Sequence, residues 1–275
     1  MHNNQKKIAL INDFTGFGRC SVAVQLPIIS ALRVQCCPLP TSVLSNHTGF
    51  ESFQFTDFTP QMRGYIDEWR KLGLSFSGIC TGFLGSAEQI EIVRDFLEEF
   101  GGDGTVTVID PVMGDYGVPY STYTPEMCSK MKELVKYANI LTPNLTEACI
   151  LLGEKYDSSI KADKVEQYAR ALSDEGPEKV VITGIQQGSY IANFCYERGG
   201  DYHIIRTHKI GTSRSGTGDV FSAIVAADAV NSVPFSTSVR KASSFISRCI
   251  KKSIELEIPI TDGVCFEEVL SSLKV

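Results

Sequence analysis

Short apolar runs alternate along this chain with longer segments in which apolar residues recur every three or four positions. A short apolar run bounded by turn residues predicts a buried β-strand, and the longer period predicts an amphipathic helix. The predicted strands are residues 7–11, 76–80, 105–109, 139–141 and 179–182. The predicted helices are residues 21–32, 63–72, 86–100, 125–137, 160–172, 236–252 and 264–273, with two more opening near Asn144 and Gly216. This order predicts an α/β fold with a mostly parallel central sheet flanked by helices.

Two segments depart from the alternation. Residues 34–44 are predicted to be extended, since Pro38 and Pro40 oppose a central helix. Residues 188–195 and 202–207 read as a hairpin turning at Gly199-Gly200. The chain has no internal repeat, low-complexity segment or linker-like stretch. We therefore expect a single domain over residues 1–275.

A glycine-rich loop precedes the apolar run that begins at Val220. The loop reads Ser215-Gly216-Thr217-Gly218-Asp219, and the run behind it is alanine-rich, as in a buried helix. Free backbone N–H groups and the positive dipole end make such a helix start an anion site suited to phosphate. Asp219 is then either an acid favoured by the helix dipole or a general base facing a substrate hydroxyl. The loop alone leaves both interpretations open.

Polar residues follow the predicted strands at Asn12-Asp13, Thr81, Asp110, Thr142 with Asn144, and Thr183. In largely parallel sheets, ligands bind outside the carboxyl ends of the strands, so these side chains should share one edge. Each residue taken singly has a structural explanation, such as Asn144 and Glu147 as a helix-capping pair. Taken together, Asp110 and Glu147 beside an anion loop indicate a magnesium and phosphate site.

The composition limits the classes of partner that this protein could bind. The net charge is −6, which argues against a nucleic-acid or anionic-membrane partner, because both need clustered Lys and Arg. The nine cysteines form no zinc-like spacing and predict reduced, mostly buried thiols. The polar N-terminus predicts no signal peptide, and no apolar run approaches the ~18 residues of a membrane helix. We therefore expect a cytoplasmic protein that binds small molecules.

A dinucleotide-binding interpretation begins at Gly16-Phe17-Gly18, which follows the first predicted strand. The stretch lacks the third glycine of that fingerprint, and no acid ends a second strand about 20 residues later. A bound dinucleotide cofactor is therefore disfavoured.

Gly216-Thr217-Gly218-Asp219 resembles the GxGD signature of ribokinase-like small-molecule kinases, and Asn144-Leu145-Thr146-Glu147 is similar to their NxxE magnesium motif. The stretches at residues 45–50, 81–86 and 110–115 resemble the pyridoxal (vitamin B6) kinases within that superfamily. The motifs follow the family's order over nearly the whole chain. The resemblance implies a ribokinase-like three-layer sandwich, a homodimer, Mg²⁺, ATP as phosphoryl donor, and K⁺ as a candidate monovalent cation.

The resemblance also implies a role for individual residues in phosphorylating the 5′-hydroxymethyl group of pyridoxal, pyridoxamine or pyridoxine. Asp219 would act as general base, and the amides of Gly216, Thr217 and Gly218 would stabilise the transferring phosphoryl group. The other implied site residues fall into two sets. Those implied for ATP are Asp110, Asp115, Asn144, Glu147 and Thr183, of which Asp110 and Glu147 would also hold the metal. Those implied for the pyridine substrate are Asp13, His47, Thr48 and Phe83, together with Asp219.

Several residues depart from the pattern of the pyridoxal kinases. Asn12-Asp13 stands where many have Gln-Ser, and Phe50 and Phe83 stand where Tyr is common. We hypothesise that Asp13 accepts a hydrogen bond from a cationic ring nitrogen or an aminomethyl group, which would favour pyridoxamine. Asp219 stands where some related kinases have Cys, so no covalent cysteine route is implied. The alternatives are a kinase for hydroxymethylpyrimidine or a sugar, and a non-catalytic B6-binding protein.

Overall fold

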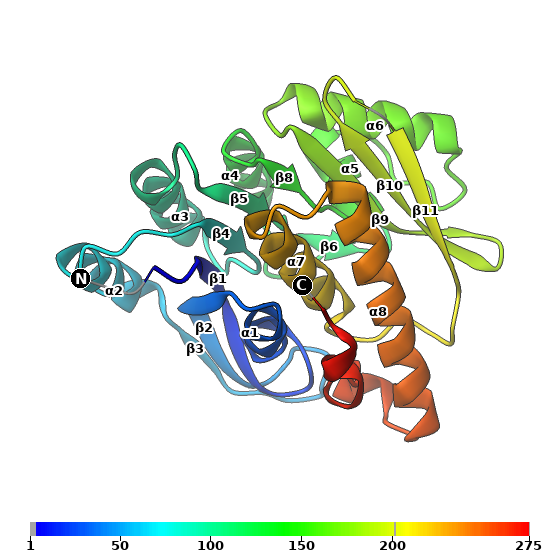
Figure 1. Cartoon of the computed structure of the whole chain (residues 1–275), viewed down its shortest axis with the longest axis horizontal. Helices are drawn as coiled ribbons and strands as arrows, with labels where there is room; N and C mark the ends of the chain where they lie inside the picture. The colour runs from blue at the N-terminus through cyan, green and yellow to red at the C-terminus, as the bar shows by residue number, and fades with distance from the viewer. Residues whose placement is uncertain (1–3, 201, 275) are drawn as a thin grey trace.

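The computed structural model describes residues 4–200 and 202–274, and one nine-stranded sheet runs through them (Figure 1). The strand order is β11-β10-β9-β8-β5-β4-β1-β2-β3. The strands of this sheet are β1 (Lys7–Phe17), β2 (Gln35–Asn46), β3 (Phe55–Asp57), β4 (Gly78–Thr81), β5 (Val106–Ile109), β8 (Ile140–Leu141), β9 (Lys179–Gln187), β10 (Tyr190–Glu197) and β11 (Tyr202–His208). The six neighbouring strands β9, β8, β5, β4, β1 and β2 pair in parallel, while β3, β10 and β11 pair antiparallel to their neighbours.

Helices cover both faces of the sheet, so the fold has three layers (Figure 1). The helices of one face are α1 (Ser21–Ala31), α7 (Thr217–Val230) and α8 (Phe235–Glu255). Those of the other are α2 (Thr59–Lys71), α3 (Ala87–Phe100), α4 (Pro125–Val135), α5 (Leu145–Leu152) and α6 (Ala162–Asp174). The predicted α/β fold, with its ribokinase-like layering, is confirmed, and the expectation of one domain over residues 1–275 stays a prediction.

The two faces of the sheet contribute to two separate hydrophobic clusters. Ile8 and Leu10 of β1 point into the cluster with α1, α7 and α8, while Ala9 and Ile11 point into the other. This alternation follows from the two-residue period of a strand. Because both faces are covered by helices, the central strands β5 and β8 and the first half of β1 are largely apolar, which is why they appear in the sequence as short continuous runs.

Three local predictions were wrong. The first strand does not end at Asn12 but continues to Phe17, with a shift of register between Asn12 and Phe14. The predicted helix at 264–273 is a 3₁₀ helix over Glu267–Ser272. The predicted strand at residues 179–182 continues to Gln187, so that Thr183 lies inside β9. Between β5 and α4, a small hairpin forms from β6 (Gly114–Asp115) and β7 (Val118–Pro119). The shift of register keeps Asn12 and Asp13 at the edge where the other strands end.

Strand β2 contains two prolines and still belongs to the sheet. Pro38 and Pro40 pair with β1, and β3 pairs only with the later residues Ser42, Val43 and Leu44. Over its first half β2 is therefore an edge strand with one neighbour. Proline is tolerated there because its missing N–H would have faced away from the sheet.

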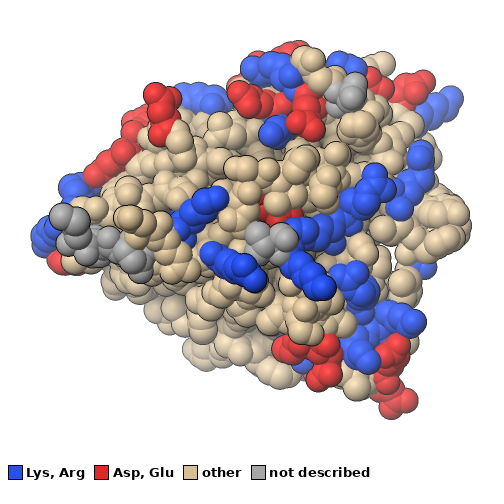
Figure 2. All heavy atoms as spheres, in the orientation of Figure 1, with Lys and Arg blue, Asp and Glu red and all other residues tan. Residues whose placement is uncertain are grey.

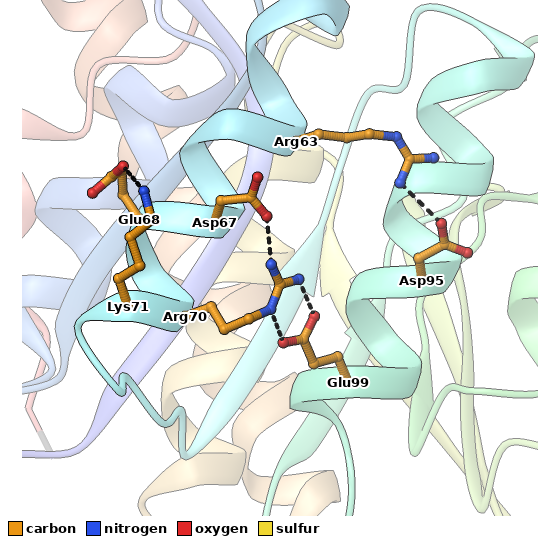
Figure 3. A network of polar contacts seen from close by, with 7 residues as sticks. All are labelled: Arg63, Asp67, Glu68, Arg70, Lys71, Asp95 and Glu99. Atoms are coloured by element: carbon orange, nitrogen blue, oxygen red, sulfur yellow. Dashed lines mark hydrogen bonds and ion pairs between the residues drawn. The ribbon is translucent and has the colours of Figure 1, made fainter.

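Exposed ion pairs join α2 to α3 (Figure 3). Arg70 donates two hydrogen bonds to Glu99, at 2.6 and 2.7 Å, and also bonds Asp67. Arg63 reaches Asp95 at 3.2 Å. Exposed pairs contribute little to stability, so this network aligns two surface helices and the buried faces of those helices supply the main attraction. Elsewhere, Lys and Arg side chains gather along α8 despite the net negative charge (Figure 2).

The nine cysteines are all free thiols and most are buried, as the sequence predicts. Within the described part of the chain, no helix combines the length and the apolar character that crossing a membrane requires.

Candidate active site

The glycine loop leads into α7 with the geometry of an anion site. Gly216 is the N-cap of α7, has φ +86°, and makes no capping hydrogen bond through a side chain. A Cβ on Gly216 would overlap the carbonyl oxygen of Arg19, so only glycine fits there. A Cβ on Gly218 would have no heavy atom within 4 Å apart from its chain neighbours and the adjoining backbone of α7. The start of α7 is therefore held tightly on its inner side and open on its outer side.

Asp219 lies in the first turn of α7, beside Asn12 and Asp13 of β1. The Asn12 Nδ2 group donates to Asp219 Oδ1 at 3.2 Å. Loss of hydration raises the pKa of Asp219 to about 7, and the Ser21 backbone and the Asn12 amide oppose that rise. A carboxyl group with this pKa can exchange a proton near neutral pH, as a general base requires. After the β10–β11 hairpin the chain therefore returns to the edge of the sheet where Asn12 lies.

Asp110 and Glu147 form a buried acidic pair next to Asp219. Asp110 follows β5, and Glu147 lies in the first turn of α5. Burial first, and then repulsion by Asp219, raises the pKa of Asp110 to about 8. Burial and the Asp110 charge likewise raise the pKa of Glu147 well above its ordinary value. None of the ion pairs in residues 4–200 and 202–274 includes these three carboxylates.

A cation would relieve this repulsion, so the residues present fit a magnesium ion. No group of three or more His, Cys, Asp or Glu in the described part of the chain could hold a metal by itself. Mg²⁺ differs from most metals in using one or two carboxylates together with waters and substrate phosphates. Asp110 and Glu147 supply that number of carboxylates at the edge where the anion loop opens.

The substitution Asp110→Asn should stabilise the metal-free protein, increasingly so as the pH rises. Because the pKa of Asp110 is raised from 3.8 to about 8 in the folded chain, wild type loses stability as pH rises through that interval. The neutral amide avoids this loss. Calorimetry without Mg²⁺ should show the variant's advantage in melting temperature growing between about pH 6 and pH 8. Asp103→Asn, on an exposed turn, is the control, and an advantage independent of pH would contradict this account.

Glu147 and Asn144 also form the capping pair that the sequence allows. Asn144 Oδ1 accepts from the Glu147 N–H at 2.9 Å, and Glu147 Oε2 accepts from the Asn144 N–H at 2.8 Å. Glu147 Oε1 accepts from the Met113 N–H at 3.2 Å. The structural explanation for this pair is confirmed. The Glu147 carboxylate can still bind a metal ion as well, since each of its oxygens has two lone pairs.

The small β6–β7 hairpin is fastened to the start of α5. The Asn144 Nδ2 group donates to the Gly114 carbonyl at 2.8 Å, and the Gly117 N–H donates to Thr146 Oγ1 at 2.9 Å. Asp115 is exposed on this hairpin. Thr183 lies beside Asn144 through a parallel β-bridge. The residues expected to contact ATP are thus gathered around the carboxyl ends of β5 and β8 and the adjacent middle of β9.

Two of the residues expected to contact the second substrate lie next to the base. Asp13 is buried, and its Oδ2 accepts from Thr15 Oγ1 at 2.8 Å. Burial raises the pKa of Asp13, while hydrogen bonds from Ser21 and Thr15 oppose the rise. The Phe83 N–H donates to Asn12 Oδ1 at 2.8 Å, which joins β1 to the segment after β4. Asp13 and Phe83 therefore flank Asn12 and Asp219.

His47 and Thr48 lie farther out on the rim. His47 Nε2 is 2.6 Å from the Thr261 carbonyl oxygen, and its ring packs on Phe50 with centroids 4.7 Å apart. Thr48 is exposed in the following turn. No hydrogen bond in the described residues joins Thr48 to Asp13, Phe83 or Asp219. The structure thus brings His47 to the C-terminal segment, a neighbour that the sequence did not reveal.

Two polar residues near the base were missed by sequence reasoning. Gln25 accepts from Asn12 Nδ2 at 2.8 Å, and its Nε2 donates to Ser222 at 3.1 Å. Both Gln25 and Ser222 are fully buried. A signal was present in the sequence, because each is a polar residue inside an otherwise apolar helical run. Buried polar groups need partners, so such a position predicts a polar contact inside the fold.

The sequence model of the phosphomethylpyrimidine kinase family matches residues 29–261. The chain belongs to this family. The relatives of known name are kinases for two different kinds of substrate, a pyrimidine and a B6 vitamer. The hydroxymethylpyrimidine/phosphomethylpyrimidine kinase of Haemophilus influenzae is 29% identical over 64% of this chain and 65% of that enzyme. The pyridoxal kinase of Leifsonia xyli is 24% identical over 90% of each chain.

A solved structure from the family is more similar still. A protein of Bacteroides thetaiotaomicron, provisionally assigned as a phosphomethylpyrimidine kinase, was crystallised with pyridoxal. It is 36% identical with a TM-score of 0.95, covering 99% of this chain and 97% of that chain. By contrast, this chain covers just under two thirds of the length of the Haemophilus enzyme. Family membership therefore leaves the substrate open between a B6 vitamer and a hydroxymethylpyrimidine.

Proposed function

We propose that this chain catalyses ATP-dependent phosphorylation of the 5′-hydroxymethyl group of pyridoxal, pyridoxamine or pyridoxine, giving the 5′-phosphate. The observation that carries the proposal is Asp219, whose raised pKa of about 7 suits proton transfer, at the uncapped start of α7. A base next to an anion site is the arrangement that phosphoryl transfer to a hydroxyl requires.

In the proposed reaction the substrate oxygen attacks the γ-phosphorus of ATP. As that bond forms, the bond from the γ-phosphorus to the bridging oxygen breaks and ADP leaves. Asp219 takes the hydroxyl proton. The amides of Gly216, Thr217 and Gly218 stabilise the negative charge on the transferring group, and the open side of Gly218 leaves room for it.

The remaining predicted residues bind and orient the two substrates. Asp110 and Glu147 would hold Mg²⁺, with Asp115, Asn144 and Thr183 toward ATP. The metal would neutralise phosphate charge when bound. Asp13, His47, Thr48 and Phe83 would line the pyridine pocket. A homodimer and a K⁺ requirement belong to this proposal through the family resemblance, and a cytoplasmic location belongs to it through the composition.

The second candidate is a hydroxymethylpyrimidine kinase with the same base and metal residues. The family name and the Haemophilus relative favour it. The vitamer assignment is supported by the resemblance at residues 45–50 and 81–86, and by the pyridoxal in the Bacteroides crystal. A non-catalytic binding protein is disfavoured, because binding alone would not require Asp219 to lie beside an anion site.

The deciding experiment measures ATP- and Mg²⁺-dependent formation of the phosphate ester from each candidate substrate. The panel contains pyridoxal, pyridoxamine, pyridoxine and hydroxymethylpyrimidine. Preferred turnover of a B6 vitamer supports the proposal. If only hydroxymethylpyrimidine is phosphorylated, the proposed phosphoryl transfer stands but the substrate assignment is wrong. If none of the four compounds is phosphorylated, the kinase assignment is overturned.

The substitution Asp13→Ser should reduce the preference for pyridoxamine over pyridoxal. Asp13 is a buried acid beside the base, and a bond from a cationic aminomethyl group to a carboxylate is worth about 1.5–3 kcal/mol. We therefore expect the ratio of kcat/KM for pyridoxamine to that for pyridoxal to fall by about tenfold or more. Asp103→Ser should leave the ratio unchanged. An unchanged ratio in Asp13→Ser would reject the hypothesis.

A further inference from the structure

We propose that Asn12 is a positioning residue for the base, because its single side-chain amide joins Asp219 to both Asp13 and Phe83. The inference rests on the proposed function of Asp219 and adds a residue that sets the direction of its carboxylate. Asn12 is 1% exposed and lies at the shift of register in β1.

All four hydrogen-bonding positions of the Asn12 amide are occupied. Nδ2 donates to Asp219 Oδ1 at 3.2 Å and to Gln25 Oε1 at 2.8 Å. Oδ1 accepts from the N–H groups of Asp13, at 2.9 Å, and Phe83, at 2.8 Å. Because a backbone N–H can only donate, these two bonds decide which atom of the amide is the oxygen. Nδ2 must then point to Asp219.

The neighbours of Asn12 prevent it from turning. A Cβ on Gly82 would overlap the Asn12 amide, so glycine at this position leaves the room that the side chain needs. On the far side, Gln25 Nε2 donates to Ser222 Oγ at 3.1 Å, and Ser222 Oγ is 3.1 Å from the Gly218 carbonyl. A buried chain of hydrogen bonds thus runs from β1 through α1 to the first turn of α7.

This arrangement fixes the direction of the Asp219 carboxylate, because Oδ1 receives the Asn12 donor. Among the titratable groups that face Asp219, the Asp13 carboxylate disfavours its charged form. Asp219 in turn helps to raise the pKa of four other groups, namely Cys20, Cys80, Asp110 and Tyr120. Asn12 is the side-chain donor that favours the charged form of Asp219 among the described residues.

The test compares pH profiles of kcat for wild type and Asn12→Asp. The aspartate keeps the size of the side chain and the oxygen that accepts from Asp13 and Phe83, while it removes the donor to Asp219. We expect the acidic limb of the profile to move upward by about one pH unit or more, with activity recovering at higher pH. A uniform loss at every pH, with the limb unmoved, would show a merely structural role and overturn the inference.

Two further variants separate positioning from folding. Asn12→Ala removes the donor without adding an acid, so its limb should move in the same direction by less, and it decides the case if Asn12→Asp does not fold. Gln25→Met breaks the chain behind Asn12 but leaves the bond to Asp219, so its limb should stay in place.

A titration that needs no turnover keeps this inference separate from the proposed function. The ¹³C signal of the Asp219 carboxyl carbon reports its pKa directly in both proteins. A midpoint unchanged by Asn12→Asp would overturn the role of Asn12. Absence of turnover in wild type on every substrate would instead overturn the proposed function alone.

Discussion

The variant Asp219→Asn should lose about 10²- to 10⁴-fold in kcat, with little change in the KM for ATP. The amide is close in size to the carboxylate and keeps an oxygen that can accept from the Ser21 backbone, but it cannot take the proton from the attacking hydroxyl. The expected loss is confined to the chemical step because the anion loop and the acidic pair remain in place.

Steady-state kinetics with the preferred acceptor, together with calorimetric binding of ADP, measure the two parts of this expectation. Asp103→Asn serves as the matched control, since it makes the same chemical change on an exposed turn. If Asp219→Asn retained more than about a tenth of wild-type turnover, Asp219 would not be the base.

Replacing the two glycines of the loop by alanine should have opposite effects on the stability of the protein. Gly216→Ala places a side chain at φ +86° and against the Arg19 carbonyl, so it should lower stability by about 1–3 kcal/mol and abolish activity. Gly218→Ala lies inside the first turn of α7 with open space around its Cβ. It should keep or raise stability, since alanine exceeds glycine in a helix by about 0.5–1 kcal/mol.

Activity should nevertheless fall in Gly218→Ala, because its methyl group would occupy the space proposed for the transferring phosphoryl group. Urea unfolding and turnover, measured on both variants, separate the two effects. A Gly218→Ala variant that is both stable and fully active would remove the phosphoryl group from this side of the loop.

The layers of the fold were predictable because each helix and strand carries its own signal. The buried strands are short continuous apolar runs, and caps such as Ser86 with Gln89 mark helix starts in the chain itself. The errors lie where tertiary contacts override the local pattern. Residues 264–273 have a helical pattern, yet only a 3₁₀ helix forms there. The apolar residues around Asn12 did not indicate that the strand continues through a shift of register.

The candidate site was predictable in part for the same reason. Asp110 and Asn144 each follow a strand, and parallel strands end at one edge, so their proximity follows from chain order. Thr183 lies inside β9, which continues past the predicted strand end to Gln187. The contact between His47 and Thr261 follows from no local rule. His47 lies in the loop after β2 and Thr261 in a 3₁₀ helix over Ile260–Asp262, and neither segment contains a residue that indicates the other.

The contacts that complete the site join distant parts of the chain, and this has a consequence for folding. Asn12 is separated from Asp219 by 207 positions, His47 from Thr261 by 214, and Arg19 from Glu267 by 248. Contacts of such long range form late, since the entropy of closing a long loop must be overcome first. During refolding from denaturant, helical circular dichroism should therefore return before enzymatic activity, and nascent chains that lack α7 should have most of the sheet without a functional centre.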